Sequence, residues 1–278
     1  MKLAFANSNY KDADIIFLGV PDESGNRSYR KGSSKAPYII RKVSNERFVF
    51  KRDNKKYLAQ PQTGFIKKKM HDYGDVNKKI LNKEIERILN DDKKIIICGG
   101  DHSITTEILK GYNNVVKDLS VIYFDAHPDF ICSNKKYYGS VICDINDYKN
   151  IKFKNSLEIG IREPEKEELI NLRKSTLMTF TSLDILKLGV NKIFNKIRKR
   201  VTNKVYVSID FDVLDPAFAP GVSTPVPGGL TSIQLIYLIK SIAKLNLIGL
   251  DITEINPNYD INNMTSHLAA KLILEILG

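Results

Sequence analysis

Residues 120–129 read SVIYFDAHPD, an apolar run that leads directly into two aspartates and a histidine. The first five of these residues are of strand length and rich in β-branched and aromatic side chains, without the regular polar alternation of a half-exposed strand. This pattern predicts a strand buried on both faces, as in a parallel sheet covered by helices. Similar runs recur along the chain at residues 14–20, 94–98, 157–161, 177–180, 204–209 and 247–250.

The segments between these runs have helical periodicity. In residues 78–89, for example, apolar side chains recur at the spacing of one buried helix face. The other predicted helices cover residues 103–112, 165–174, 190–201, 232–245 and 265–277. Buried strands that alternate with helices predict a three-layer α-β-α sandwich with a mostly parallel sheet.

The chain has no internal repeat and no low-complexity linker. Residues 41–69 are the least regular stretch, and we predict surface loops there with at most a short strand. A length of 278 residues is compatible with one or two domains, but α/β folds of this size often form one. We therefore expect a single domain over residues 1–278.

The chain is basic, because 43 Lys and Arg against 32 Asp and Glu give a formal net charge of +11. A clustered basic face is typical of nucleic-acid binding. Here the basic clusters are short, at residues 51–56, 67–69 and 198–200, and none alternates with aromatic side chains in a nucleic-acid motif. We interpret the charge as solvated surface and predict no nucleic-acid partner; the opposite hypothesis would rest on net charge alone.

No run of about 18 apolar residues is present, so we predict no contact with a membrane through a spanning helix. The amino-terminal apolar run is too short for a secretory signal peptide. The three cysteines, Cys98, Cys132 and Cys143, are an odd number without paired spacing. We therefore predict reduced thiols in a cytoplasmic protein, with Cys98 as a small buried hydrophobic residue.

Three of the apolar runs end in acids or histidines. Residues 94–98 lead into Gly99-Gly100-Asp101-His102-Ser103, residues 120–124 into Asp125-Ala126-His127-Pro128-Asp129, and residues 204–209 into Asp210-Phe211-Asp212. In open α/β sheets, ligands bind outside the carboxyl ends of the strands. Side chains alternate along a strand, so Asp125, His127 and Asp129 would share one side if the extended conformation continued. The same holds for Asp210 and Asp212.

Four aspartates and two histidines would then converge at one edge of the sheet. The set is His102, Asp125, His127, Asp129, Asp210 and Asp212. Without cations, carboxylates this close would repel one another and raise each other's pKa. Mixed carboxylate and imidazole ligation suits first-row divalent metals, and the excess of carboxylate oxygens favours Mn²⁺. Six ligands suit a pair of ions about 3.5–4 Å apart, which lowers the pKa of a water between them enough to supply hydroxide near neutral pH.

These segments resemble the signature motifs of the ureohydrolase family, which includes the arginases and agmatinases. The three signatures are similar to residues 99–103, 125–129 and 208–216 of this chain. Further similarity covers residues 19–21, 28–32, 36–41, 224–231 and 254–260. The resemblance therefore extends in order over most of the chain, and it is closest to the agmatinases.

The resemblance implies an arginase-like three-layer fold with two Mn²⁺ ions. One ion would be held by His102, Asp125, Asp129 and Asp210 and the other by Asp125, His127, Asp210 and Asp212, so that Asp125 and Asp210 bridge. Glu254 matches the carboxylate that hydrogen-bonds the substrate guanidinium in the family. Asp129 would steady the tetrahedral intermediate together with the metals.

Family members hydrolyse a guanidinium group to urea and an amine. The resemblance therefore implies an amidinohydrolase with a small guanidino substrate, and agmatine would give putrescine and urea, as in polyamine biosynthesis. The usual assemblies of the family are trimers and hexamers, so we expect a homo-oligomer.

The chain departs from the family pattern after residue 129. The family usually carries a further histidine there, credited with proton shuttling or substrate contact, and the nearest alignment puts Gly139 at that position. The two remaining histidines, His71 and His267, lie in other segments, and we interpret them as structural or surface residues. Proton delivery would then come from water or from another group, or the substrate differs, or the activity is reduced. General acid–base help is typically worth about 10²–10⁴-fold, so its loss would slow hydrolysis without abolishing it.

Substrate choice depends on Ile131. Arginases usually have Asn at this position, where it helps to hold the amino-acid end of the substrate, and an apolar side chain cannot hydrogen-bond an α-carboxylate. This favours agmatine over arginine. The alternatives are another activity of the family (guanidinobutyrase, formimidoylglutamase or arginase) or a metal-binding homologue with lost or weak catalysis.

Overall fold

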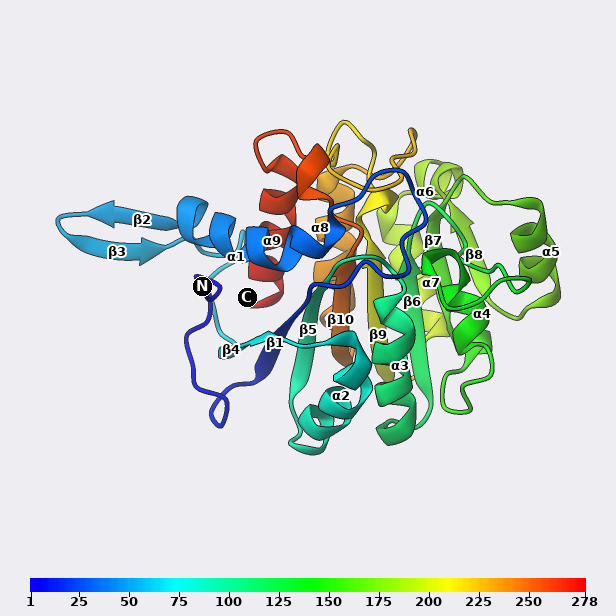
Figure 1. The fold of residues 1–278 in the computed structure, drawn as a ribbon, viewed down its shortest axis with the longest axis horizontal. Helices are drawn as coiled ribbons and strands as arrows, with labels where there is room; N and C mark the ends of the chain where they lie inside the picture. The colour runs from blue at the N-terminus through cyan, green and yellow to red at the C-terminus, as the bar shows by residue number, and fades with distance from the viewer.

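The computed structural model describes all 278 residues, and a central eight-stranded sheet organises it (Figure 1). The strand order is β4-β1-β5-β10-β9-β6-β7-β8, and every pairing is parallel. The strands are β1 (Ile15–Val20), β4 (Met70–Asp75), β5 (Lys94–Gly99), β6 (Leu119–Phe124), β7 (Leu157–Ile161), β8 (Met178–Thr181), β9 (Lys204–Asp210) and β10 (Leu247–Thr253). A separate antiparallel hairpin consists of β2 (Val49–Arg52) and β3 (Lys55–Leu58).

Nine α-helices surround the sheet. They are α1 (Ala36–Arg47), α2 (Leu81–Asn90), α3 (Ile104–Val115), α4 (Val141–Ile145), α5 (Lys166–Lys174), α6 (Ser182–Leu188), α7 (Val190–Arg200), α8 (Ser232–Ile242) and α9 (Met264–Ile276). Buried side chains of α1, α6, α7, α8 and α9 belong to one apolar cluster, and those of α2, α3 and α4 belong to another. No helix has both the length and the apolar character needed to cross a bilayer.

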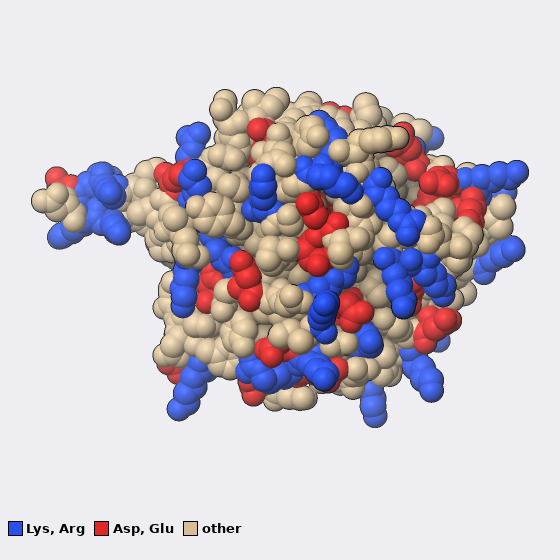
Figure 2. Space-filling view, in the orientation of Figure 1, with Lys and Arg blue, Asp and Glu red and all other residues tan.

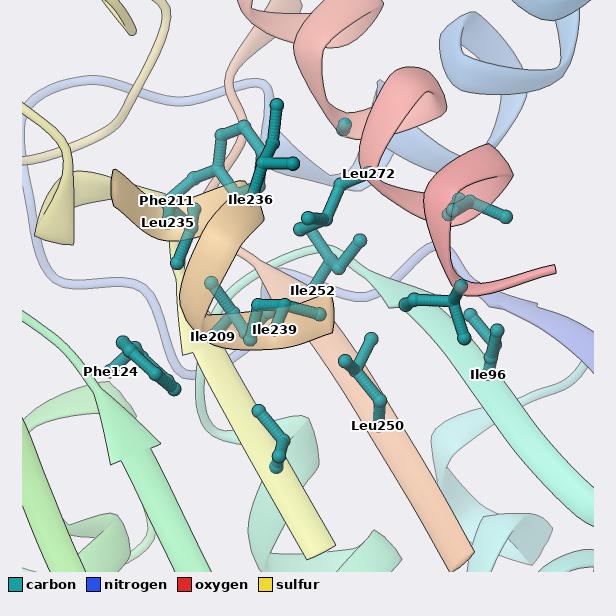
Figure 3. Close-up of a cluster of buried hydrophobic side chains, with 14 of the residues drawn as sticks. Ile96, Phe124, Ile209, Phe211, Leu235, Ile236, Ile239, Leu250, Ile252 and Leu272 are labelled. Carbon is teal, nitrogen blue, oxygen red and sulfur yellow. The ribbon is translucent and has the colours of Figure 1, made fainter. Parts of the chain in front are cut away.

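Strand side chains alternate between the two clusters. On β5, Ile96 and Cys98 pack on one face of the sheet, whereas Ile95 and Ile97 pack on the other. Each face therefore has its own apolar layer under helices, and the predicted three-layer α-β-α sandwich is confirmed. Figure 3 shows part of the larger cluster, in which α8 lies over β9 and β10.

All seven predicted strands are present, but β4 is missing from the prediction. Acids and a histidine interrupt the apolar pattern of its sequence, MHDYGD. One of these acids, Asp72, is buried and pairs with the buried guanidinium of Arg41 at 2.9 Å. Burial of a paired charge thus replaces the apolar signal on which strand prediction relies.

The helices α1, α4 and α6 are also absent from the prediction. The second and third are only five and seven residues long, too short for a periodic pattern. Helix α1 has Pro37 in its first turn, a position that suits proline, and it lies within a stretch without a clear apolar stripe.

The basic residues at 51–56 lie on the β2–β3 hairpin, which projects from the body of the molecule (Figures 1 and 2). Residues 41–69, predicted as loops with at most a short strand, therefore contain two strands. On the face shown in Figure 2, the remaining Lys and Arg side chains are interspersed with Asp and Glu. This distribution agrees with the interpretation of the net charge as solvated surface.

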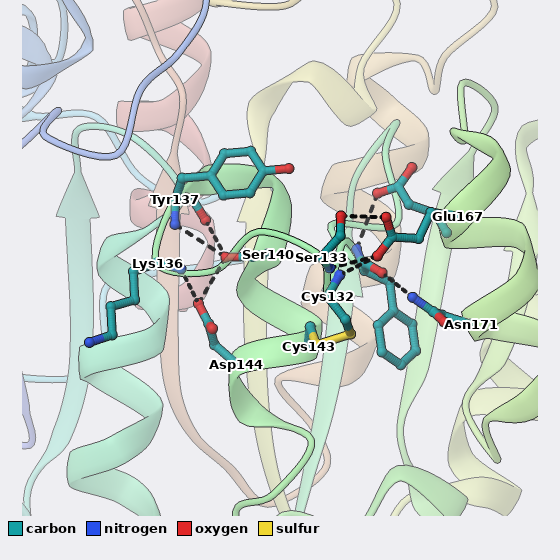
Figure 4. Close-up of a disulfide and its surroundings, with 11 residues drawn as sticks. Cys132, Ser133, Lys136, Tyr137, Ser140, Cys143, Asp144, Glu167 and Asn171 are labelled. Atoms are coloured by element: carbon teal, nitrogen blue, oxygen red, sulfur yellow. Dashed lines mark hydrogen bonds between the residues drawn. A yellow bond between two sulfur atoms is a disulfide. The ribbon is translucent and has the colours of Figure 1, made fainter.

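The cysteine prediction is wrong in one respect. Cys132 and Cys143 form a disulfide with their Cα atoms 5.5 Å apart, whereas Cys98 is free and buried as predicted (Figure 4). The sequence separation of 11 residues gave no sign of this pairing. A tight turn at residues 138–140 folds the chain back into α4, and this turn brings the two side chains together.

Ile239 tests the packing of α8 on the sheet. Its side chain is completely buried in the larger cluster, whereas Ile233 on the same helix is 58% exposed. We expect Ile239→Ala to lower the free energy of unfolding by about 2–5 kcal/mol, because it leaves a cavity that the parallel sheet cannot fill. Ile233→Ala is the matched control and should change it by less than about 0.5 kcal/mol in urea denaturation. Equal effects of the two changes would contradict this account of the core.

Candidate functional site

The predicted site residues gather at the carboxyl ends of neighbouring strands. In the sheet order, β5, β10, β9 and β6 are consecutive. His102 follows β5, Glu254 follows β10, Asp210 ends β9 and Asp125 follows β6. All strands of a parallel sheet end at the same edge, so residues far apart in sequence meet there.

The local geometry differs from the alternation that the sequence suggests. The extended conformation stops at Phe124, and Asp129 has a left-handed backbone with φ of 48°. After Asp210, residues Phe211–Val213 form a 3-10 turn instead of continuing the strand. The side chains therefore do not lie on one face of a continuing strand, as the sequence suggested. They still converge, because turns bring them together.

Hydrogen bonds to the aspartates shape these turns. Asp125 Oδ1 accepts from the His127 backbone N–H at 2.7 Å, and Asp210 Oδ1 accepts from the Asp212 N–H at 2.8 Å. Asp212 Oδ1 then accepts from the Ala126 N–H at 3.0 Å, which joins the two loops. In each of these three carboxylates one oxygen accepts a backbone N–H, and the other oxygen faces the cluster of aspartates and histidines.

The second oxygens surround two histidines. His102 Nδ1 lies 3.1 Å from Asp125 Oδ2 and 3.3 Å from both Asp129 Oδ2 and Asp210 Oδ2. His127 Nδ1 lies 3.0 Å from Asp212 Oδ2 and 3.5 Å from Asp125 Oδ1. The structure thus brings all six predicted ligands together, with Asp125 between the two histidines.

A chain of hydrogen bonds behind His102 sets its tautomer. Ser208 donates to Asp251 Oδ1 at 2.8 Å, so its oxygen accepts from His102 Nε2–H at 2.9 Å. Asp251 also accepts from Tyr206, and Tyr123 stacks on the His102 ring while donating to Asp129 at 2.6 Å. With one proton fixed on Nε2, a neutral His102 would present the Nδ1 lone pair to the carboxylates, the arrangement in which imidazole binds metals.

Sequence reasoning missed these supporting residues. Asp251 and Ser208 lie at the ends of apolar strand segments, and both are completely buried. A polar residue within a fully buried strand was the available signal, because such groups are retained only where they are hydrogen-bonded.

Arg162 is another residue that the sequence reasoning missed. Its guanidinium donates to the backbone carbonyls of Asp212 at 2.5 Å and Val226 at 2.7 Å. It thereby ties the loop after β9 to the end of β7. Its position directly after an apolar run was the signal that could have found it.

The electrostatics show how unfavourable this cluster is without cations. Burial raises the pKa of Asp129 to about 6, and that of Asp210 well above its usual range, and neighbouring carboxylates add to both shifts. Burial disfavours protonated His102, but its carboxylate partners outweigh this and raise its pKa well above the ordinary value. The same balance raises the pKa of His127, whose charge holds that of Asp212 below its usual range. Protons here occupy positions that a metal ion would take.

A further observation indicates that this set of donor atoms suits divalent cations. Asp125 Oδ2 is buried and accepts no hydrogen bond. The nearest nitrogen, His102 Nδ1 at 3.1 Å, would present a lone pair to it when the ring is neutral, so a positive charge (a proton or a metal ion) is needed between the two atoms. In two groups of residues the donor atoms lie close enough together to hold one ion. These groups are His102 with Asp125 and Asp129, and His127 with Asp125 and Asp212. Asp125 belongs to both groups, as a bridging ligand would.

Glu254 lies beside this cluster but is not in the cavity wall. Its Oε1 accepts from the His102 backbone N–H at 2.8 Å, and its own N–H donates to the Gly100 carbonyl at 2.8 Å. Burial raises its pKa to about 8, and the charge of Asp101 adds to the shift. It has a left-handed backbone with φ of 62°, which is uncommon outside glycine and occurs often at functional sites. The predicted contact with substrate remains a prediction.

A cavity of about 320 Å³ opens beside His127 and Asp129. Its wall consists of His127, Asp129, Ile131, Tyr137, Tyr138, Gly139, Glu163, Glu165, Glu168 and Thr224. Four of these residues are acids, and none is Lys or Arg. Burial raises the pKa of Glu168 to about 7, and the charge of Asp129 adds to this shift.

Tyrosines form the cavity wall around Gly139, where the sequence lacks the family's histidine. A Cβ atom on Gly139 would lie 3.0 Å from the Tyr137 ring and from its hydroxyl oxygen. Tyr137 therefore fills the space that a side chain at position 139 would need. His71 and His267 are elsewhere, on the edge strand β4 and on α9, and do not contribute.

Comparison with known proteins identifies the family. The sequence model of the Arginase family matches residues 13–278. The chain belongs to the arginase family. This result agrees with the ureohydrolase signatures in the sequence and confirms the predicted class of enzyme, an amidinohydrolase that releases urea.

Individual relatives of this arginase-family chain support the assignment. It is 37% identical over 272 residues to an agmatinase of Blochmanniella floridana, covering 95% of this chain and 87% of the relative. The crystal structure of an agmatine ureohydrolase of Thermoplasma volcanium is similar with a TM-score of 0.84 and 29% identity, covering 99% and 93% of the two chains. An arginase from Bacillus cereus matches with a TM-score of 0.81 and 25% identity, over 95% and 98%.

The pKa shifts predict how pH affects the metal-free protein. Asp129 and Glu254 keep their protons up to about pH 6 and about pH 8 when folded, whereas unfolded carboxyls lose them near pH 4. The folded state therefore binds more protons between these values, and its stability should fall as the pH rises from about 5 to about 8. Mn²⁺ binds the ionised carboxylates, so the increase in Tm that it causes in chelator-treated protein should be larger at about pH 8 than at about pH 5.5.

Calorimetry of two variants completes this experiment. Asp125→Asn should remove most of the Mn²⁺-dependent increase in Tm, because Asp125 belongs to both donor groups. Asp147→Asn changes an exposed aspartate and is the control. A full Mn²⁺ response in Asp125→Asn would remove Asp125 from the assigned ligands.

Proposed function

We propose that this protein is an agmatinase that uses two Mn²⁺ ions to hydrolyse agmatine to putrescine and urea. The observation that carries the proposal is the acid-lined cavity beside the six clustered aspartates and histidines. The agmatinase names of its relatives support the same activity.

The charge of the cavity favours agmatine within the guanidino class. Agmatine is cationic at both ends, since it has a guanidinium group and an ammonium group but no carboxylate. Glu163, Glu165 and Glu168 extend the acidic character outward from Asp129, and no Lys or Arg lies in the wall to bind a carboxylate. Ile131 is buried in the same wall and offers no hydrogen bond to an amino-acid end. Arginine and guanidinobutyrate would bring a negative charge next to these acids.

We assign one ion to His102, Asp125, Asp129 and Asp210 and the other to Asp125, His127, Asp210 and Asp212. When bound, the ions would supply Lewis-acid charge and lower the pKa of water enough to make it nucleophilic near neutral pH. Asp129 belongs both to this cluster and to the cavity wall, so it is placed to steady the tetrahedral carbon centre. Thr224 lines the cavity and donates to Asp212 Oδ2 at 3.0 Å, so it holds that buried carboxylate behind the cavity wall.

Glu254 is the proposed partner of the substrate guanidinium. Its Oε1 is occupied by the His102 backbone N–H, so we assign the guanidinium to the other oxygen. The ionised form is needed for this pairing, and the cationic guanidinium favours that form despite the raised pKa.

The remaining assignments are part of the same proposal. We place the protein in the cytoplasm, as a homotrimer or homohexamer, with each chain folded as one domain over residues 1–278. One continuous sheet with a helix layer on each face supports the single domain. The small guanidino substrate is the only partner apart from other copies of the chain.

Urea release from a panel of guanidino compounds tests the function. We expect Mn²⁺-reconstituted protein to act on agmatine with a kcat/KM at least about tenfold above that for guanidinobutyrate or arginine, because their carboxylates oppose the acidic wall. A preference for either of these two would overturn the choice of substrate. No urea from any compound, with Mn²⁺ still bound, would indicate a metal-binding homologue without catalysis.

Glu165→Gln tests the role of the acidic wall. Glu165 is exposed at the start of α5 and lines the cavity, so removing its charge should raise the KM for agmatine about threefold to tenfold with little change in kcat. Glu46→Gln changes an exposed glutamate on α1 and should leave both constants unchanged. If Glu165→Gln lowered kcat and left KM unchanged, the residue would not be a binding contact.

A further inference from the structure

The disulfide Cys132–Cys143 closes a segment of the cavity wall. We call residues 132–143 the strap (Figure 4). Tyr137, Tyr138 and Gly139 lie at its turn and form one wall of the cavity. The two sulfur atoms join the beginning and the end of the strap, so the bond spans the segment that shapes the cavity.

The first half of the strap has few other attachments to the molecule. Residues 133–136 are all exposed. At its start, the backbone N–H groups of Cys132 and Ser133 donate to the Glu167 carboxylate at 2.7 and 2.8 Å. The Ser133 hydroxyl donates to the same carboxylate at 2.6 Å, and these hydrogen bonds with Ser133 and Cys132 lower the pKa of Glu167, whose side chain is only partly buried. Hydrogen bonds to a side chain that water can reach compete with water and hold a loop less firmly than core contacts do.

The second half of the strap is attached to the core. Cys143 lies in α4, whose apolar side chains pack in the smaller buried cluster. The Ile142 N–H donates to the backbone carbonyl of Asp129 at 3.0 Å, and the Ile131 N–H donates to that of Gly139 at 3.1 Å. Through these contacts the strap adjoins a residue of the proposed metal centre. Apart from one hydrogen bond, from the Lys136 N–H to Asp144 Oδ2 at 3.1 Å, the disulfide is therefore the link that fixes the loosely held half to the firmly held half.

Within the strap, the Tyr137 N–H donates to Ser140 Oγ at 3.1 Å, whereas the contacts of the two tyrosines with the rest of the molecule are weaker. The Arg27 guanidinium lies 4.1 Å from the centre of the Tyr137 ring, on a segment outside the strap. The Tyr138 N–H donates to the Gly25 carbonyl only at 3.4 Å. These contacts orient the tyrosines when the strap is closed, but they do not replace a covalent link across its base.

We propose that Cys132 and Cys143 form a reversible thiol–disulfide switch that controls how firmly the strap closes the substrate cavity. Cys132 is partly exposed and Cys143 is buried, so an incoming thiolate attacks at Cys132. Permanent disulfides are rare in the cytoplasm, where such pairs are usually redox-responsive. The consequence for substrate binding rests on the proposed hydrolysis of agmatine.

The chemistry is thiol–disulfide exchange with low-molecular-weight thiols. One thiolate attacks Cys132, breaks the protein S–S bond and releases Cys143 as a thiolate, which takes up a proton. A second thiolate then attacks the mixed disulfide, and the products are two protein thiols and one low-molecular-weight disulfide. Re-oxidation by that disulfide is the reverse sequence, so electrons and protons balance without another reactant.

Trypsin provides a readout that is independent of activity. Lys135 and Lys136 lie in the exposed half of the strap, and cleavage there should be at least about tenfold faster in reduced protein, because a mobile loop fits a protease better than a closed one. Cleavage at Lys55 and Lys56 in the β2–β3 hairpin is the internal control and should not respond to reduction. In oxidised protein the fragments cut within the strap should stay joined until the gel is run under reducing conditions.

Kinetics of the double variant Cys132→Ser/Cys143→Ser separate a switch from a structural bond. Reduction of the wild type should raise the KM for agmatine about threefold to tenfold with kcat within about twofold, and re-oxidation should restore it. The double variant should behave like reduced protein in both buffers, in kinetics and in strap cleavage. Its Mn²⁺-dependent increase in Tm should match that of the wild type, which shows that it is folded.

Two results would overturn the switch. One is mass spectrometry that finds both thiols free under oxidising conditions. The other is a rate of strap cleavage that is the same in oxidised, reduced and double-variant protein. If cleavage responds and agmatine gives no urea, the proposed function fails and the redox-dependent strap stands. If cleavage responds but KM does not, the proposed control of the substrate cavity is wrong.

Discussion

Mutual repulsion among buried carboxylates is the constraint on which the site depends. Asp125, Asp129, Asp210 and Asp212 are all nearly inaccessible to solvent, and Asp125 Oδ2 has no hydrogen-bond donor. Burying several negative charges without compensation is strongly unfavourable. The fold tolerates them because one oxygen of most of these groups accepts a backbone N–H and the other faces a histidine. The cluster lacks positive charge, and this raises the pKa values of several of its aspartates and histidines. Divalent cations would supply the missing charge.

The surrounding structure orients the cluster from two sides. Behind it, Ser208 and Asp251 hold the tautomer of His102, and in front Arg162 holds the loop that carries Asp212. These residues neither face the cavity nor bind the substrate in our proposal. They fix the direction of lone pairs and loops, which determines whether two ions and a guanidinium can be positioned together. The strap adds a third wall whose rigidity depends on a covalent bond.

The basic residues that give the chain its net charge lie apart from the acidic residues that line the cavity. Exposed Lys and Arg are spread over the face shown in Figure 2 and over the β2–β3 hairpin, whereas Glu163, Glu165 and Glu168 line the cavity. A cationic substrate is therefore attracted at short range despite the positive protein as a whole, since salt screens surface charges beyond about 8–10 Å. Net charge thus gave no information about the ligand of the site.

The amino-acid sequence by itself determined the layer architecture, seven strands of the sheet and the six aspartates and histidines that cluster at its edge. Apolar runs that end in Asp125 or Asp210 predict both a buried strand and the edge at which the chemistry lies, because parallel strands share their carboxyl ends. Tertiary structure alone decided the pairing of Cys132 with Cys143, the strand β4 and the network behind His102. Each of these depends on contacts between residues far apart in sequence or on turns whose backbone conformation has no periodic pattern. Local sequence patterns indicate which residues are buried and on which side of a strand they lie. Which residues contact one another across the fold is decided only when the whole chain packs.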